Sequence, residues 1–282
     1  MGQHFLVAEE VVECILSAAK LGPEDIVVEV GPGLGTLTRN LAEHANKVIA
    51  VELDSQLVSI LRKRLSSFPN VKITHADILK IAPQQLLEDV IAMSQSPERS
   101  EGAAKQSQLA PSYKVVANLP YYITSPVLRH FLEAQLQPSV MVVMVQKEVG
   151  EAIAATPGKM SLLSVRTQFY SNPSIITYVP AESFYPPPKV DSLVLRLDVY
   201  SKPSIEVSDV ADFFDIVICG FSSPRKQLRN SLAHSLGMSP SQVVLLLGKA
   251  GIEAKRRAET LSLEEWKGLW EVFAPFRKQS QC

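Results

Sequence analysis

The chain has 282 residues, of which 28 are basic and 29 acidic, so its formal net charge is -1. This balance excludes a uniformly basic coat for nucleic acid, and any contact with RNA or DNA must use local basic patches. The length predicts one large domain and one smaller domain. Cys14, Cys219 and Cys282 lie far apart and form no CxxC pair, which indicates neither a zinc site nor a disulfide framework.

The sequence carries no sign of a secretory leader or a membrane span. Met1 to His4 do not begin a charged segment followed by an apolar one, and no apolar run reaches the length of a spanning helix. We therefore expect a cytoplasmic protein. We also expect it to act as a monomer and, from the cysteine spacing, to bind no metal.

The larger, amino-terminal part of the chain alternates between the patterns of helices and strands. Apolar side chains recur at helical spacing from Ala8 to Lys20, which predicts an amphipathic helix. Apolar runs predict strands at 26–30, 48–51, 71–74, 115–117, 140–145, 175–179 and 192–197. The last of these alternates in period two, so we expect it to be half-exposed. The alternation predicts an α/β fold, a Rossmann-like sheet with helices on both faces and a ligand crevice at the strands' carboxyl ends.

Two changes of composition divide the sequence further. Residues 94–112 are rich in Ser, Gln, Glu and Lys and read as an exposed insertion. A helix is predicted at 158–170, and past Lys202 the strand patterns stop. Four helical stretches then follow, at 213–221, 226–236, 241–249 and 263–273. We therefore predict an α/β domain at 1–201 and a small all-helical domain at 202–282.

Gly31, Gly33 and Gly35 follow the first strand of the sheet. A dinucleotide fingerprint, G-x-G-x-x-G, would need glycine at position 36, where Thr36 stands. The tighter turn lets the backbone approach a ligand that has no pyrophosphate, and S-adenosylmethionine is such a ligand. The alternative is that these glycines only allow the strand and the next helix to pack closely.

Acidic residues close the second and third strands. Glu52 is placed to bridge two ribose hydroxyls, and Asp77 to meet the amine of an adenine ring. Either residue alone is better explained as a helix N-cap or a solvated carboxylate. Their repetition at successive strand ends, after a glycine turn, favours a ligand site.

The fourth strand ends in Asn118-Leu119-Pro120-Tyr121, a stiff turn suited to a planar substrate. The Asn118 amide both donates and accepts hydrogen bonds, and Tyr121 offers a flat face for stacking. Turn chemistry alone is the alternative. Further on, Phe184 begins a proline-stiffened loop that can hold an aromatic ring in one orientation.

These motifs together resemble the ribosomal RNA adenine N6,N6-dimethyltransferase family over residues 3 to about 270. The bacterial KsgA-type enzymes of the small ribosomal subunit are the most similar branch. The resemblance rests on Gln3-His4-Phe5-Leu6, the glycine turn, Glu52-Leu53-Asp54, Ala76-Asp77, Asn118-Leu119-Pro120-Tyr121 and 184–192, with Arg225-Lys226 and 229–232.

The resemblance implies an S-adenosylmethionine-dependent fold and activity, with a site and a substrate. The residues expected to line the cofactor site are His4, Leu6, Gly31, Gly33, Glu52, Asp77 and Asn118. Asn118 and the Leu119 carbonyl would hold the adenine amine, and Tyr121 and Phe184 would sandwich the ring. The implied reaction dimethylates two adjacent adenosines near the 3′ end of 16S rRNA within the assembling small subunit.

Three basic residues stand at relative positions i, i+1 and i+4 around the start of the predicted helix 226–236: Arg225, Lys226 and Arg229. There they would contact rRNA phosphates. A solvated helix face is the alternative. The sequence departs from the family pattern at Tyr122, where Asn is common, in the long 94–112 segment, and in lacking a basic leader. Two other functions remain open: the related resistance methylase of large-subunit rRNA, and a non-catalytic RNA-binding assembly factor or transcription cofactor on the same fold.

Overall fold

The computed structural model describes residues 4–88 and 112–279, so all but the last residue of the predicted 94–112 insertion lies outside the described residues. The chain divides into two compact units. The first comprises Met1–Gly150 with Asn172–Ser201, and the second Glu151–Ser171 with Lys202–Cys282. Residues 151–171, which the sequence-based division assigns to the first domain, pack instead with the helices of the second unit, where the Phe169 and Phe213 rings stack 5.4 Å apart.

The first unit is built on a seven-stranded sheet with the order β4-β3-β2-β5-β6-β9-β7. The strands are β2 (Ile26–Val30), β3 (Lys47–Glu52), β4 (Val71–His75), β5 (Tyr113–Asn118), β6 (Val140–Gln146), β7 (Ser171–Val179) and β9 (Ser192–Val199). The β4-to-β6 neighbours are parallel, and β9 is antiparallel to β6. The order reverses between β2 and β5, and the carboxyl ends of these two strands open a crevice at that point. The predicted Rossmann-like α/β fold is confirmed.

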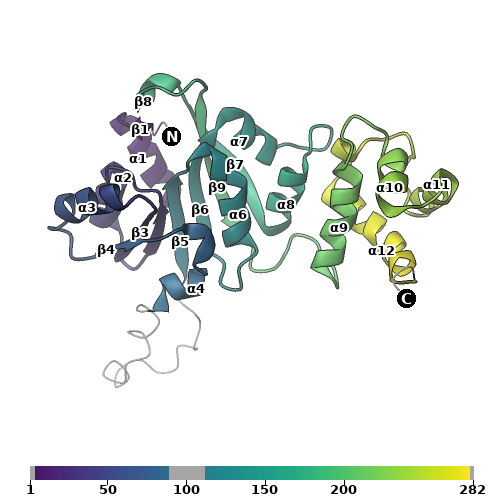
Figure 1. Ribbon diagram of the computed structural model, residues 1–282, viewed down its shortest axis with the longest axis horizontal. Helices are drawn as coiled ribbons and strands as arrows, with labels where there is room; N and C mark the ends of the chain where they lie inside the picture. The colour runs from purple at the N-terminus through teal and green to yellow at the C-terminus, as the bar shows by residue number, and fades with distance from the viewer. Residues whose placement is uncertain (1–3, 89–111, 280–282) are drawn as a thin grey trace, which may run out of the picture. The chain divides into compact units, whose positions relative to one another are not determined.

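Helices cover both faces of this sheet (Figure 1). They are α1 (Glu9–Ala19), α2 (Thr36–His44), α3 (Ser55–Arg64), α6 (Thr124–Leu132) and α7 (Lys147–Ile153), while the short α4 (Pro83–Leu86) lies at one end of the sheet (Figure 1). Ile15 of α1 and Leu41 of α2 share one apolar cluster with Val27, Val48 and Val116 of the sheet. Burial of such side chains, at about 25 cal/mol per Å², fixes these helices on the sheet.

The prediction that the 192–197 strand is half-exposed is wrong. Ser192 to Leu195 are all buried, because β9 lies between β6 and β7 and the sheet is covered on both faces there. The alternation in the sequence comes from Arg196 and Asp198, whose charged side chains pair with each other (Arg196 Nε to Asp198 Oδ1, 3.0 Å).

A second sheet of two short strands joins distant parts of the first unit. β1 (Phe5–Leu6) pairs antiparallel with β8 (Phe184–Tyr185), so that Leu6 lies opposite Phe184. His4 Nδ1 lies 2.6 Å from the Pro186 carbonyl oxygen and extends this contact. The amino-terminal segment and the Phe184 loop therefore form one structure.

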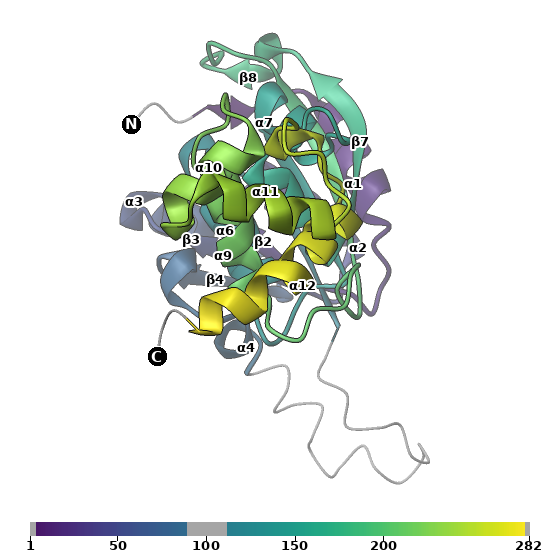
Figure 2. The same cartoon turned by 90° about the vertical axis from the view of Figure 1, so that its right-hand side faces the viewer.

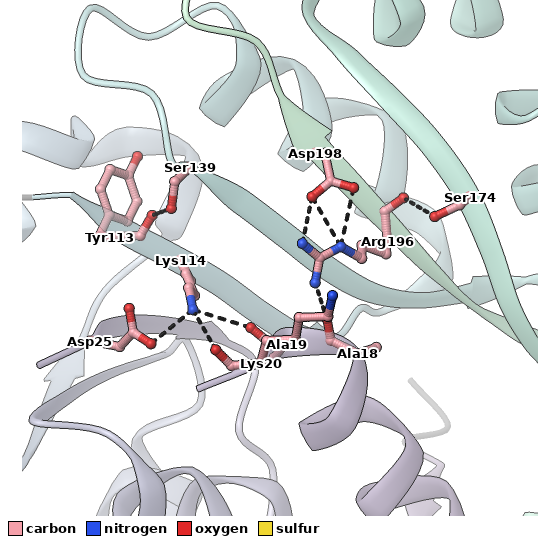
Figure 3. A network of polar contacts seen from close by, with 10 residues as sticks. All are labelled: Ala18, Ala19, Lys20, Asp25, Tyr113, Lys114, Ser139, Ser174, Arg196 and Asp198. Atoms are coloured by element: carbon pink, nitrogen blue, oxygen red, sulfur yellow. Dashed lines mark hydrogen bonds and ion pairs between the residues drawn. The ribbon is translucent and has the colours of Figure 1, made fainter. Parts of the chain in front are cut away.

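The carboxyl end of α1 is held by Lys114 of β5 (Figure 3). The Lys114 Nζ donates to the carbonyls of Ala19 (3.2 Å) and Lys20 (2.8 Å) and pairs with Asp25 Oδ2 at 2.8 Å. A cation at this end stabilises the helix, because the last carbonyls have no intrahelical partners.

A second cation reaches the same helix end from β9. Arg196 donates to the Ala18 carbonyl while Asp198 holds its guanidinium, as Figure 3 shows. The helix that follows His4-Phe5-Leu6 is thus fixed to both β5 and β9.

The second unit is helical. It contains α8 (Leu162–Tyr170), α9 (Val210–Phe221), α10 (Leu228–Leu236), α11 (Pro240–Lys249) and α12 (Leu263–Gln279), and Figure 2 views α9 to α12 in green and yellow. Its core includes the buried Trp266, whose ring lies 5.5 Å from that of Phe221. Among helices within 4–88 and 112–279, none combines the length and apolar character needed to cross a membrane.

Three helix starts differ from the prediction by two residues or more. The helix expected from residue 213 begins at Val210, because Asp209 caps it by accepting the Asp212 N–H at 3.0 Å. The helix expected at 158–170 begins at Leu162, because Ser161 caps it by accepting the Ser164 N–H at 3.1 Å. The helix expected from residue 226 begins at Leu228, so the preceding basic residues lie in a turn.

Candidate active site

One cavity of about 870 Å³ opens at the carboxyl edge of β2, β3 and β5 in the first unit. Every residue that the sequence assigns to the cofactor or to catalysis lines it. These residues are His4, Leu6, Gly31, Gly33, Glu52, Asp77, Asn118, Leu119, Tyr121 and Phe184. Cavities of this size hold ligands as large as a nucleoside cofactor.

The glycine turn brings bare backbone to the cavity wall. Gly31 and Gly33 have φ angles of 66° and 58°, in the left-handed region that only glycine enters without strain. A Cβ on Gly33 would lie 3.4 Å from the Phe5 ring, and one on Gly31 would lie 3.6 Å from Pro120 Cδ. The turn therefore serves close packing and at the same time exposes its backbone to the cavity.

Glu52 closes β3 with a carboxylate that the backbone holds in one orientation. Its Oε1 accepts the N–H groups of Leu53 and Asp54, both at 2.9 Å, and Oε2 accepts that of Gly33 at 3.3 Å. Carboxylate oxygens can accept further hydrogen bonds, so Oε2 retains capacity toward the cavity.

Asp77 follows β4 and lines the cavity at another point. It is the N-cap of the 3₁₀ helix Ile78–Lys80, where its Oδ1 accepts the Leu79 N–H at 3.1 Å. The capping role weighed from the sequence is therefore present in Asp77, together with its place at the cavity wall.

Glu29 is a cavity residue that the sequence reasoning missed. Its side chain is only 1% exposed, and its Oε2 has no hydrogen-bond partner among the described residues. Burial is the main reason that the pKa of Glu29 is raised to about 8; the neighbouring Thr38 hydroxyl opposes the shift, and the negative charge of Glu52 adds to it. The available signal was a single charged residue inside the apolar strand Ile26–Val30.

The Asn118-Leu119-Pro120-Tyr121 turn leaves the end of β5. Leu119 continues the ladder by donating its N–H to the Met144 carbonyl at 3.1 Å, and Tyr121 begins the 3₁₀ helix Tyr121–Ile123. Phe184 is buried and Tyr121 half-buried, and both line the same cavity. The departure Tyr122 is 66% exposed at the rim, so its bulk does not fill the cavity.

The three predicted RNA-binding residues lie in the second unit, near the start of α10. Arg225 and Lys226 are exposed in the turn before the helix, and Arg229 is half-buried in its first turn. The Leu228 N–H donates to the Arg256 carbonyl at 2.8 Å, so the basic segment Lys255-Arg256-Arg257 adjoins this turn.

Comparison with known proteins decides the family. The pattern described as "Ribosomal RNA adenine dimethylase" matches residues 1–273. The chain belongs to this family. Its members are ribosomal RNA adenine dimethyltransferases, so the chain is an enzyme of that kind, with the fold of S-adenosylmethionine-dependent methyltransferases.

Curated relatives within the family have high identity over nearly the whole chain. A "Ribosomal RNA small subunit methyltransferase A" of Dehalococcoides mccartyi (strain ATCC BAA-2266 / KCTC 15142 / 195) is 48% identical over 97% of this chain and 87% of its own. The protein of the same name from Moorella thermoacetica is 42% identical, over 95% and 89% respectively.

Solved structures agree in fold. The 23S rRNA methyltransferase ErmE is 27% identical with a TM-score of 0.70, covering 96% of this chain and 99% of its own. A dimethyladenosine transferase from Plasmodium falciparum has a TM-score of 0.74 at 22% identity, covering 96% and 98%, and so supports the fold alone.

Proposed function

We propose that this enzyme uses S-adenosylmethionine to dimethylate N6 of two adjacent adenosines near the 3′ end of 16S rRNA, within the assembling small ribosomal subunit. The choice of subunit is supported by 48% identity to a small-subunit methyltransferase, against 27% to a 23S rRNA methyltransferase. The observation that carries the proposal is the single cavity that gathers the glycine turn, two acidic strand ends and Asn118 to Tyr121. The enzyme would act in the cytoplasm, as a monomer and without a metal.

The residues present fit the cofactor. The bare backbone at Gly31 and Gly33 admits its methionine end, and the oriented carboxylate of Glu52 can accept hydrogen bonds from ribose hydroxyls. Asp77 and Leu6 would contact the adenine ring of the cofactor, and His4 would close the side of the cofactor site that the amino-terminal segment forms. S-adenosylmethionine supplies a methyl group that its sulfonium has already activated.

Asn118 and Leu119 would position the target amine. The lone pair of an adenine amine is delocalised into the ring, which makes the nitrogen a poor nucleophile. Hydrogen bonds to the Asn118 side-chain oxygen and the Leu119 carbonyl would favour a more tetrahedral nitrogen and direct its lone pair. Positioning and oriented dipoles therefore account for most of the rate, and no strong base is needed, because a methylated amine cation readily loses its proton.

Tyr121 and Phe184 would hold the adenine outside its stack. Stacking on aromatic side chains contributes about 1–3 kcal/mol per base, which offsets the unstacking of the target nucleotide. The cavity must also accept a monomethylated amine for the second transfer.

The helical domain would dock rRNA through Arg225, Lys226 and Arg229. The exposure of Arg225 and Lys226 supports phosphate contact. Replacing both by Ala should weaken binding to small subunits and flatten its dependence on salt concentration, as measured by filter binding from low to high salt. Unchanged affinity and slope would remove them from the interface.

Asn118→Ala tests the proposed chemistry. Methyl transfer should fall below detection, while the dissociation constant for S-adenosylmethionine, measured by isothermal titration calorimetry, should change less than tenfold. Near-normal dimethyladenosine formation by the variant would refute the role of Asn118. Absence of cofactor binding by the unaltered enzyme would refute the proposed function itself.

A further inference from the structure

Ser192 makes a direct contact with one of the two rings proposed to hold the adenine. It is the first residue of β9, is 0% exposed, and lies opposite Gln146 of β6. Its Oγ lies 2.7 Å from the Tyr121 hydroxyl oxygen, a normal hydrogen-bond distance between hydroxyls. A tyrosine ring held at both its backbone and its hydroxyl has little freedom to rotate.

Asp191, the preceding residue, reaches the segment that carries the other ring. Its Oδ1 accepts the N–H of Ala181 at 3.2 Å, and its carbonyl accepts the N–H of Lys147 at 3.0 Å. Ala181 begins the 3₁₀ turn Ala181–Ser183, which leads directly into Phe184. Asp191 thus ties the start of the Phe184 segment to the first residue of α7, directly after β6.

The turn before Phe184 is also fixed from its other side. The Ser183 carbonyl accepts the Val7 N–H at 2.9 Å, and Leu6 pairs with Phe184 across the small sheet. The turn Ala181–Ser183 is thus held by the amino-terminal segment on one side and by Asp191 on the other, and Asp191 connects it to the main sheet.

We propose that Asp191 and Ser192 are positioning residues, which set the placement of the Tyr121 and Phe184 rings relative to each other and hence the entry of the target adenine. This inference rests on the proposed function of the two rings. Asp191 and Ser192, adjacent where β9 begins, contact the two sides of the adenine site, so the loss of either contact misplaces the base while Gly33 and Glu52 of the cofactor site keep their own hydrogen bonds.

Ser192→Ala, Tyr121→Phe and the double variant test the first contact. With small subunits that carry unmethylated adenosines, each single variant should transfer methyl groups about five- to tenfold more slowly, with the S-adenosylmethionine dissociation constant unchanged. The double variant should be no slower than the slower single variant, because both changes remove the same hydrogen bond. Losses that multiply, or a wild-type rate in Ser192→Ala, would overturn the role of Ser192.

Ser171→Ala is the matched control. Ser171 is equally buried, and its hydroxyl donates to the Thr167 carbonyl at 2.9 Å at the carboxyl end of α8, a helix that contributes no residue to the cavity. Its removal should lower the melting temperature without changing the methylation rate. If Ser171→Ala slowed methylation as much as Ser192→Ala, the effect would be one of general stability and the proposal would fail.

Asp191 is exposed, so its replacement leaves the core intact and tests the second contact. Asp191→Ala should slow methyl transfer about fivefold, whereas Asp191→Asn keeps the acceptor oxygen and should restore the rate. Equal loss in both variants, or loss in neither, would overturn the role of Asp191. If the unaltered enzyme failed to methylate these subunits, the proposed function itself would be refuted. A double-mutant cycle on the melting temperatures of Ser192→Ala, Tyr121→Phe and the double variant would still measure the coupling between Ser192 and Tyr121.

Discussion

Glu29 should make the folded state less stable as the pH rises. Its pKa is raised from 4.5 to about 8 by burial, with a contribution from the charge of Glu52. Between these two values the folded chain holds a proton that the unfolded chain has released, so the free energy of unfolding falls with increasing pH. For one proton, the free energy of unfolding changes by about 1.4 kcal/mol per pH unit, so it falls by roughly 2 kcal/mol between pH 6 and pH 8.

Glu29→Gln removes the titration while keeping the shape of the side chain. Urea unfolding of wild type and variant at pH 6 and pH 8 would measure how much the free energy of unfolding of each protein changes with pH. Because the two tryptophans, Trp266 and Trp270, lie in the second unit, circular dichroism is the appropriate signal for the sheet that carries Glu29.

The variant should lose about 2 kcal/mol less stability than wild type over this interval. Other groups titrate equally in both proteins, so they cancel in the comparison. If the two proteins lost stability in parallel, Glu29 would be ionised in the folded state and the account of its burial would be wrong.

Two further substitutions test the frame around the cavity. Lys114→Met removes a cation from the end of α1 and leaves Asp25 without that partner, so the free energy of unfolding should fall by about 2 kcal/mol. The control Arg39→Ala removes an exposed ion pair with Glu43 and should change it by less than about 0.5 kcal/mol. Equal effects of the two substitutions in chemical unfolding would contradict the anchoring role of Lys114. Gly33→Ala places a side chain on a residue with a left-handed φ and brings its Cβ against the Phe5 ring. The dissociation constant for S-adenosylmethionine, measured by calorimetry, should therefore rise about tenfold. An unchanged constant would contradict the close approach of the Gly33 backbone to the cofactor.

The main sheet follows from the sequence because its strands are short apolar runs separated by helical periodicity. The runs at β2, β3 and β6 have almost no polar residue, as strands covered on both faces do. The positions of Glu52, Asp77 and Asn118 at strand ends then follow from the parallel order, since carboxyl ends of parallel strands share one edge.

The rest depends on contacts between distant residues, which local patterns do not encode. β1 and β8 have two residues each, too few to show a period, and pair across almost the whole first unit. The hydrogen bond between Ser192 and Tyr121 has no local signal either. The helix at Leu162–Tyr170 is identifiable from its sequence, but its packing with the second unit depends on the aromatic cluster that it joins.

Mass spectrometry of nucleosides from each ribosomal RNA tests the proposed reaction most directly. Unmethylated small and large subunits would be incubated separately with the enzyme and methyl-labelled S-adenosylmethionine. We expect labelled N6,N6-dimethyladenosine at two adjacent positions near the 3′ end of the small-subunit RNA, and none in the large-subunit RNA. Label confined to the large-subunit RNA, or dimethyladenosine in neither, would contradict the proposed reaction.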